Sequence, residues 1–162
     1  MKPGKLYGVG IGPGDPRYLT LRAADVLRSV DVIFTVISQN ASSSVSRSVV
    51  ESLEPRGEIH LQIFSMSRDK AVRAAQVQAN ADAIITELKA GRDCAFATLG
   101  DAMTYSTFGY VLEIIREAIP GVEVRTVFFD PVNSLVSGSM TEQQWIDGIK
   151  SASDQMRANI IE

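Results

Sequence analysis

Residues 94–108 read CAFATLGDAMTYSTF, an apolar run that leads into a glycine turn and then into a helical pattern. The apolar run is 94–97, the turn is Leu99-Gly100-Asp101, and the helical pattern continues towards Pro120. This order predicts a buried strand, a tight turn and a helix. The strand would carry a carboxylate and several hydroxyl groups at its carboxyl end, which is the edge where open parallel sheets bind their ligands.

The same alternation of strand and helix runs along the chain from residue 6 to residue 127. Short runs rich in β-branched and apolar residues indicate strands, and longer segments with apolar residues on one face indicate helices. We expect strands over 6–11, 31–37, 58–64, 94–97 and 122–127, and helices over 21–29, 45–53 and 71–90 and before Pro120. The pattern predicts an α/β fold: a single Rossmann-like domain with a doubly wound, mainly parallel five-stranded sheet and helices on both faces.

Length and composition narrow the classes of protein to consider. A chain of 162 residues with 45% hydrophobic residues can bury one sizeable core, so we expect one domain. The net charge of −3 gives no basic footprint for general nucleic-acid binding. No apolar run approaches the ~20 residues that span a bilayer, and the single cysteine, Cys94, cannot form an internal disulfide. We therefore expect a cytoplasmic protein with no nucleic-acid partner and no membrane partner.

A glycine-rich loop follows the first expected strand. Gly8, Gly10 and Gly12 are closely spaced, and residues 12–16 read GPGDP, which is a dense turn signal. The spacing superficially resembles a dinucleotide-binding fingerprint, but two prolines interrupt it and no acidic residue ends a second strand about 20 residues later. Two interpretations stay open: a tight turn that needs glycine for its backbone geometry, and a loop that approaches a ligand.

The titratable residues outside these loops give weaker signals. The only histidine, His60, lies inside an expected strand with no second metal ligand at a useful spacing, so neither a zinc site nor a serine–histidine–acid triad is supported. We expect no metal, no catalytic nucleophile, and a structural or exposed role for His60. The run Arg68-Asp69-Lys70 precedes the longest expected helix, where it can hold substrate carboxylates or simply be a solvated helix start.

Three stretches together resemble the signature motifs of the tetrapyrrole methylases, and most of all those of the precorrin-2 C20-methyltransferases of cobalamin biosynthesis. They are GVGIGPGDPRYLTLRA at 8–23, MSRDKA at 66–71 and TLGDAMTYSTF at 98–108, and the similarity extends over residues 5–127. The resemblance implies transfer of a methyl group from S-adenosyl-L-methionine to C20 of precorrin-2 or of its cobalt-containing counterpart. Such a transfer needs both reactants held in line and no covalent nucleophile.

The resemblance also implies which residues form the site. By motif, the pocket for S-adenosyl-L-methionine would be bordered by Gly100, Asp101, Met103 and Thr104. The neighbouring cleft for the tetrapyrrole would be lined by Gly12, Pro13, Gly14 and Asp15, with Arg17, Arg68 and Lys70 as candidates for its carboxylates. Ala102 stands where the family usually has proline, which is one departure inside the central motif.

A larger departure follows residue 127, where the sequence continues as FFDPVN. Family members continue from this point into a second domain that closes over the cofactor, and that domain is not expected here. Residues 141–144 instead read TEQQ, a capping box, and an apolar stripe follows it at Trp145, Ile149, Ala152 and Met156. We therefore expect a methylase N-terminal-like domain over 1–127, and a non-family turn and capping helix over 128–162 packed on that domain.

The origin and the activity of such a chain are open at this point. Residues 133–160 faintly resemble the closing helices of ABC-transporter extracellular solute-binding proteins, so an artificial chimera and a natural truncated homologue are competing interpretations. The chain would either methylate precorrin-2, with a homodimer supplying the missing wall of the cleft, or be a catalytically inactive half-domain or engineered scaffold that retains part of the cofactor cleft. Family resemblance favours the homodimer.

Overall fold

The computed structural model describes residues 2–103 and 106–127, and these residues form the strands and helices of an α/β domain. A short 3-10 helix, Pro16–Tyr18, lies in the first loop. Within this part of the chain, no helix has the length and apolar character needed to cross a membrane. In chain order the elements are β1 (Leu6–Gly10), α1 (Leu21–Ser29), β2 (Val32–Ser38), α2 (Val45–Glu51), β3 (Glu58–Phe64), α3 (Lys70–Lys89), β4 (Cys94–Thr98), α4 (Phe108–Ala118) and β5 (Val124–Thr126).

The strands form one parallel sheet in the order β3-β2-β4-β1-β5. β1 pairs with β4 from Leu6 opposite Cys94 to Gly10 opposite Thr98, so the two strands end at the same level. The prediction of a doubly wound, parallel five-stranded sheet is confirmed, although β5 is shorter than the expected 122–127 and covers three residues.

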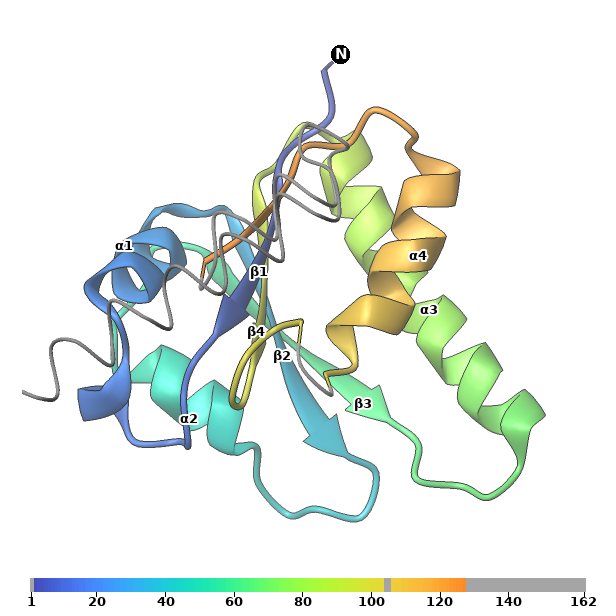
Figure 1. Ribbon diagram of the computed structural model, residues 1–162, viewed down its shortest axis with the longest axis horizontal. Coiled ribbons are helices and arrows are strands. Elements are labelled where there is room, and N and C mark those ends of the chain that lie inside the picture. Colours follow the sequence, from blue (N-terminus) through green and yellow to red (C-terminus); the bar gives the residue numbers. More distant parts are fainter. Residues whose placement is uncertain (1, 104–105, 128–162) are drawn as a thin grey trace, which may run out of the picture. The chain divides into compact units, whose positions relative to one another are not determined.

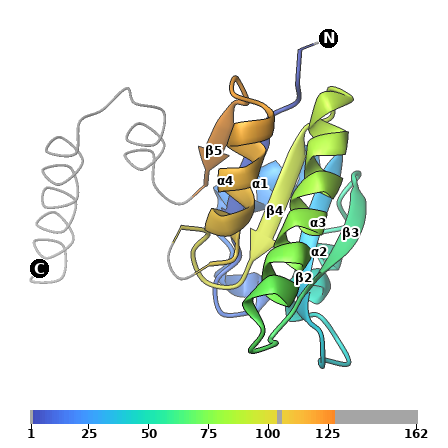
Figure 2. The same ribbon diagram turned by 90° about the vertical axis from the view of Figure 1, so that its right-hand side faces the viewer.

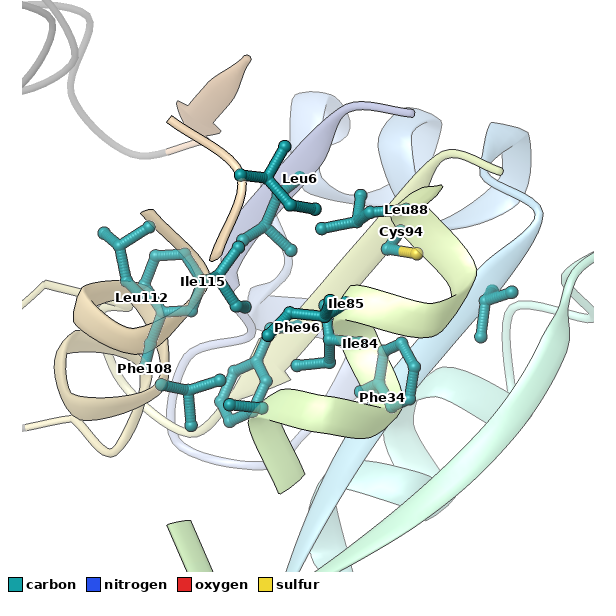
Figure 3. Close-up of a cluster of buried hydrophobic side chains, with 14 of the residues drawn as sticks. Leu6, Phe34, Ile84, Ile85, Leu88, Cys94, Phe96, Phe108, Leu112 and Ile115 are labelled. Atoms are coloured by element: carbon teal, nitrogen blue, oxygen red, sulfur yellow. The ribbon is translucent and has the colours of Figure 1, made fainter. Parts of the chain in front are cut away.

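Helices cover both faces of the sheet, as Figures 1 and 2 show. α1 and α2 pack on one face over a core that includes Val9, Leu27 and Ala97. α3 and α4 pack on the other face over a second core, part of which is drawn in Figure 3. β4 lies between the two cores, and all of its residues are buried because helices cover it on both sides. Its unbroken apolar run is typical of a central parallel strand.

Phe108 fixes the first turn of α4 against the centre of the sheet. Its ring lies 5.5 Å from that of Phe96, measured between centroids, and both side chains are buried. A Cβ atom on Gly8 of β1 would lie only 2.5 Å from Phe108 Cε1. Glycine at this position therefore lets the start of α4 approach β1 closely.

The chain reverses its direction of travel across the sheet between β1 and β4. After β1 the chain passes through α1 to β2, which lies beyond β4 in the sheet. After β4 it passes through α4 in the opposite direction, past β1, to β5 at the edge. The two loops thus leave neighbouring strands towards opposite faces. In open α/β sheets, such a switch point forms the crevice in which ligands bind.

The expectations for the end of the chain lie outside the described residues. They comprise the capping helix with its stripe from Trp145 to Met156, the domain over 128–162 and the resemblance to solute-binding proteins, all of which fall on residues 128–162.

Candidate functional site

The loops that follow β1 and β4 are joined to each other by backbone hydrogen bonds. Gly100 N–H donates to the carbonyl of Gly12 at 2.8 Å, and Gly12 N–H donates to the carbonyl of Gly100 at 3.4 Å. Just before this bridge, Ile11 N–H donates to the carbonyl of Thr98 at 2.9 Å. The structure thereby brings together two motifs that are almost ninety residues apart in the sequence.

Glycine is required on both sides of this bridge. Gly12 and Gly100 have φ angles of 67° and 70°, in the left-handed region that side chains rarely adopt. A Cβ atom on Gly10 would lie 2.5 Å from the carbonyl oxygen of Gly100, whereas one on Gly100 would meet no atom of residues 2–103 and 106–127 within 4 Å. The tight-turn interpretation of these glycines therefore holds, and none of the described residues fills the space where a side chain of Gly100 would begin.

Asp101 is half-buried at the start of the following turn. Its Oδ1 accepts a hydrogen bond from Met103 N–H at 2.9 Å, which orients the carboxylate. Ala102, the departure from the usual proline of the central motif, is buried at 1% exposure, and Met103 packs partly against the core. The turn is thus held by a side-chain hydrogen bond and by burial instead of by a proline ring. Thr104 lies outside the described residues.

Two hydroxyl groups beside this turn were not among the predicted cofactor residues. Thr98 ends β4 and is 6% exposed, and its Oγ1 accepts a hydrogen bond from Ser106 Oγ at 3.5 Å. Ser106 Oγ in turn accepts from Phe108 N–H at 3.1 Å, which connects the pair to the start of α4. A hydroxyl residue as the last residue of an otherwise apolar strand is the signal by which Thr98 could have been found.

Asp15 and Arg17, both predicted to line the tetrapyrrole cleft, bind each other in the structure. Asp15 begins the 3-10 helix by accepting from Arg17 N–H at 2.9 Å, and Arg17 Nη2 lies 2.6 Å from Asp15 Oδ2. The hydrogen bond from the Arg17 side chain holds the pKa of Asp15 below its usual value. Because the Arg17 side chain is 85% exposed, an acidic ligand can reach it, but only in competition with Asp15.

Arg68 and Lys70 lie farther along the same edge of the sheet, after β3. Both are exposed, and Asp69 between them caps α3 by accepting from Ala71 N–H at 2.8 Å. β2 separates β3 from β4, so these two cations are not at the switch point. Lys70 instead borders a hollow of about 630 Å³ between α3 and α4, whose other lining residues include Phe64, Met66 and Tyr110.

The remaining candidate groups have structural roles. His60 Nε2 lies 3.2 Å from Glu58 Oε2, and the hydrogen bonds from His60 and Arg92 lower the pKa of Glu58. Burial raises the pKa of the Cys94 thiol to about 12, so it is not a ready nucleophile. Among the residues that the structure describes, no three His, Cys, Asp or Glu side chains gather in a way that could hold a metal ion.

Sequence comparisons place this chain near enzymes of tetrapyrrole methylation. A family model described as Tetrapyrrole (Corrin/Porphyrin) Methylases matches residues 5–127. The cobalt-precorrin-2 C(20)-methyltransferase of Salmonella typhimurium is 37% identical over 125 residues, which cover 74% of this chain and 53% of that protein. The probable cobalt-precorrin-2 C(20)-methyltransferase of Methanocaldococcus jannaschii is also 37% identical, over 76% of this chain and 51% of that protein. The chain thus spans about half the length of these curated relatives.

Solved structures share the fold described above. The uroporphyrin-III-C-methyltransferase of Thermus thermophilus matches with a TM-score of 0.55 and 27% sequence identity, over 78% of this chain and 47% of that one. The cobalt precorrin-4 methyltransferase CbiF matches with a TM-score of 0.54 at 21% identity, which supports the fold alone. The region matched by the family model includes both loops of the Gly12–Gly100 bridge.

Proposed function

Because the chain belongs to the tetrapyrrole (corrin/porphyrin) methylase family, we propose that it binds S-adenosyl-L-methionine and serves methyl transfer to C20 of precorrin-2 or cobalt-precorrin-2, in the cytoplasm, as part of cobalamin biosynthesis. The observation that carries this proposal is the backbone bridge between Gly12 and Gly100 at the switch point of the sheet. It joins the two motif loops of the family into one platform. Relatives named as C20-methyltransferases support the choice of substrate.

The residues of this platform fit the methyl donor. None of the described residues fills the space beside Gly100, so a ligand there would reach the backbone. The half-buried Asp101 carboxylate would supply acceptors for hydroxyl or ammonium groups. Met103 adds a partly buried apolar side chain next to them. Gly100, Asp101 and Met103 would therefore hold the donor, as their motif predicts.

Methyl transfer depends on how the protein positions the two reactants more than on reactive side chains. When bound, S-adenosyl-L-methionine supplies a methyl group activated on a positively charged sulfur. The platform would orient it and shield it from water, which are the main contributions a protein can make to an in-line displacement.

The tetrapyrrole would approach over the loop from Gly12 to Asp15. Its acetate and propionate groups carry negative charge, and Arg17 is the exposed cation closest in sequence to this loop. Binding there would exchange the carboxylate of Asp15 for one of the substrate. Arg68 and Lys70 would meet only a substrate that extends along the edge of the sheet towards β3.

Calorimetric titration with S-adenosylhomocysteine tests this proposal. We expect saturable one-to-one binding, and at least a ~10-fold weaker affinity for Asp101→Ala, because hydrogen bonds to charged groups contribute roughly 1.5–3 kcal/mol. Asp25→Ala is the matched control, since Asp25 is exposed on α1 away from both loops. Absence of binding by the unaltered chain at millimolar ligand would overturn the proposal, and preference for NADH would indicate a generic nucleotide-binding module.

Methyl transfer is measured separately, with precorrin-2 and its cobalt form as acceptors. Transfer to either one supports the enzymatic function and identifies the substrate. Binding of S-adenosylhomocysteine without transfer would favour the alternative stated above, a half-domain that retains part of the cofactor cleft.

A further inference from the structure

We propose that the hollow between α3 and α4 is a second ligand site, separate from the predicted site of the methyl donor, and that it binds an amphipathic anion: a small aromatic body that carries one carboxylate. The hollow has a volume of about 630 Å³, which lies within the range of roughly 300–1,000 Å³ that small-molecule sites occupy. Gly100, Asp101 and Met103 do not border it. The proposal therefore does not depend on the methyl-transfer function.

The walls of the hollow are the neighbouring faces of two helices that lie side by side on one face of the sheet (Figures 1 and 2). The wall on α3 consists of residues 70, 73, 74, 77 and 78, and the wall at the start of α4 consists of residues 107, 110, 113 and 114. Steps of three and four residues keep each set on one helical face. Because buried residues of both helices pack into the same core, the fold fixes the distance between the two faces.

The inner surface of the hollow is apolar. Phe64 at the end of β3 is buried, and Val77 and Ile114 pack partly against the same core. Met66 and Tyr110 also border the hollow, but they are 73% and 66% exposed. Large apolar side chains that remain exposed around a hollow are typical of a place where a ligand buries them. An aromatic body fits here, because a thioether and a phenol ring both make favourable contacts with aromatic rings.

Two cations beside the hollow select the charge of the ligand. Lys70, the first residue of α3, is exposed, and Arg73 is half-buried one turn later. Arg73 Nη1 donates to the carbonyl of Ser67 at 2.6 Å, which orients the guanidinium. Neither cation forms an ion pair with a carboxylate of residues 2–103 or 106–127. Among the described residues that line the hollow, Glu113 is the only carboxylate, so an excess of one positive charge remains for an acidic group of the ligand.

The hydroxyl group of Thr107 supplies a further polar contact. Thr107 is the N-cap residue of α4, yet its side chain makes no capping hydrogen bond. Ser106 Oγ instead accepts from Phe108 N–H at 3.1 Å. The Thr107 hydroxyl, which borders the hollow, is therefore available to donate to a ligand carboxylate. An apolar lining with a few convergent polar groups is the usual composition of a small-molecule site.

Titration of the full chain with 1-naphthoate tests the proposal, because this probe combines a two-ring aromatic body with one carboxylate. We expect saturable one-to-one binding with a dissociation constant of about 1 mM or lower, the value that the usual binding energy per atom gives for a ligand of this size. The uncharged counterpart 1-naphthalenemethanol should bind at least ~3-fold more weakly. Absence of saturation at millimolar naphthoate, equal binding of both probes, or displacement of the naphthoate by S-adenosylhomocysteine would overturn the proposal.

Two variants with matched controls locate the probe. Tyr110→Ala should weaken naphthoate binding at least ~5-fold, because it removes an aromatic ring from the wall. Tyr18→Ala should not, since Tyr18 is also 66% exposed but lies in the first loop. Lys70→Met should weaken binding ~3-fold and remove most of the preference for the charged probe, whereas Lys89→Met, in the last turn of the same helix, should change neither. Thermal unfolding checks that all four variants fold. Unaltered binding by both Tyr110→Ala and Lys70→Met would contradict the proposal.

NMR places the probe directly. We expect cross-relaxation between the ring protons of the naphthoate and the methyl group of Met66, which borders the hollow. We expect none with the methyl group of Met103, which belongs to the predicted donor site. The reverse pattern would assign the naphthoate to the donor site and show that the hollow is not a separate one.

Discussion

The centre of the sheet and its β3 edge are held together by different kinds of contact. At the centre, the loops after β1 and β4 meet through their own backbones, and glycines make that approach possible. At the edge, β3 is joined to α3 through side chains: Gln62 Nε2 donates to the carbonyl of Asn80, and Asn80 Nδ2 donates to the carbonyl of Ile63. A Cβ atom on Gly10 would collide with the backbone of the other loop, whereas a side-chain contact tolerates a substitute of similar shape. The first region should therefore respond much more sharply to substitution.

The largest effect is expected from Gly10→Ala at the centre. The new methyl group would lie 2.5 Å from the carbonyl oxygen of Gly100, so the bridge between the two loops must open or shift. Overpacking of this kind costs about 2 kcal/mol of the free energy of unfolding, and we expect binding of S-adenosylhomocysteine to be lost with it. Chemical denaturation and calorimetric titration measure the two losses.

Gly109→Ala serves as the control for this variant. Gly109 lies in α4, and a Cβ atom there would meet no described atom within 4 Å beyond the backbone of its own helix. Alanine should stabilise the helix by roughly 0.5–1 kcal/mol. If Gly10→Ala were as well tolerated as Gly109→Ala, the close contact between the two loops would be wrong.

A smaller loss is expected from Asn80→Ala at the β3 edge. The substitution removes the hydrogen bond from Asn80 Nδ2 to the carbonyl of Ile63, which costs about 1 kcal/mol. The hydrogen bond from Gln62 is kept, because its acceptor is the backbone carbonyl of Asn80. Ligand binding at the switch point should not change, because β2 and β4 lie between the two regions. Denaturation combined with titration separates stability from binding.

Gln62→Leu changes the other side chain of the contact between β3 and α3, and we expect a different result from that of Asn80→Ala. Gln62 Oε1 is buried without a hydrogen-bond partner among the described residues, so leucine removes an unsatisfied acceptor at similar volume. We expect this variant to be neutral or slightly stabilised. A loss as large as that of Asn80→Ala would show that the Gln62 amide contributes more than its one bond suggests.

The smallest effect is expected from the exposed Asp15–Arg17 pair in the first loop. The pKa of Asp15 lies below its usual value in the folded chain, so the pair favours folding above the pKa of an unfolded aspartate, and this contribution is lost as the pH falls through the folded pKa. In Arg17→Gln the pKa of Asp15 should rise towards its usual value. NMR titration of the Asp15 carboxyl measures the shift, and an unchanged pKa would show that the ion pair does not persist in solution.

The alternation of strands and helices was readable from the sequence because each element carries its own periodicity. The order of the strands was not, since it depends on which apolar faces meet at long range. The contact between Gly12 and Gly100 follows from the adjacency of β1 and β4 and has no local signal. The assignment of Gly100, Asp101 and Met103 to the cofactor comes from their motif and stays a prediction.

Two predicted site groups illustrate the limit of sequence reasoning about charge. Arg17 was expected to face substrate carboxylates, but it already binds Asp15 two residues earlier. Lys70 was grouped with Arg68 by its position in the chain, yet only Lys70 borders the hollow between α3 and α4. Such pairings are decided by rotamers and loop geometry, which a sequence pattern does not contain.

The bridge between Gly12 and Gly100 also bears on how this scaffold can diversify. The backbone segments at Gly12 and Gly100 form an antiparallel bridge, although the strands that lead to them, β1 and β4, are parallel. The bridge thus joins the loops at the ends of β1 and β4. We expect that the loop residues after Gly12 and after Gly100 can vary in length or composition without disturbing these strands. We expect preference for one acceptor over another to evolve in those segments, on a base that stays fixed.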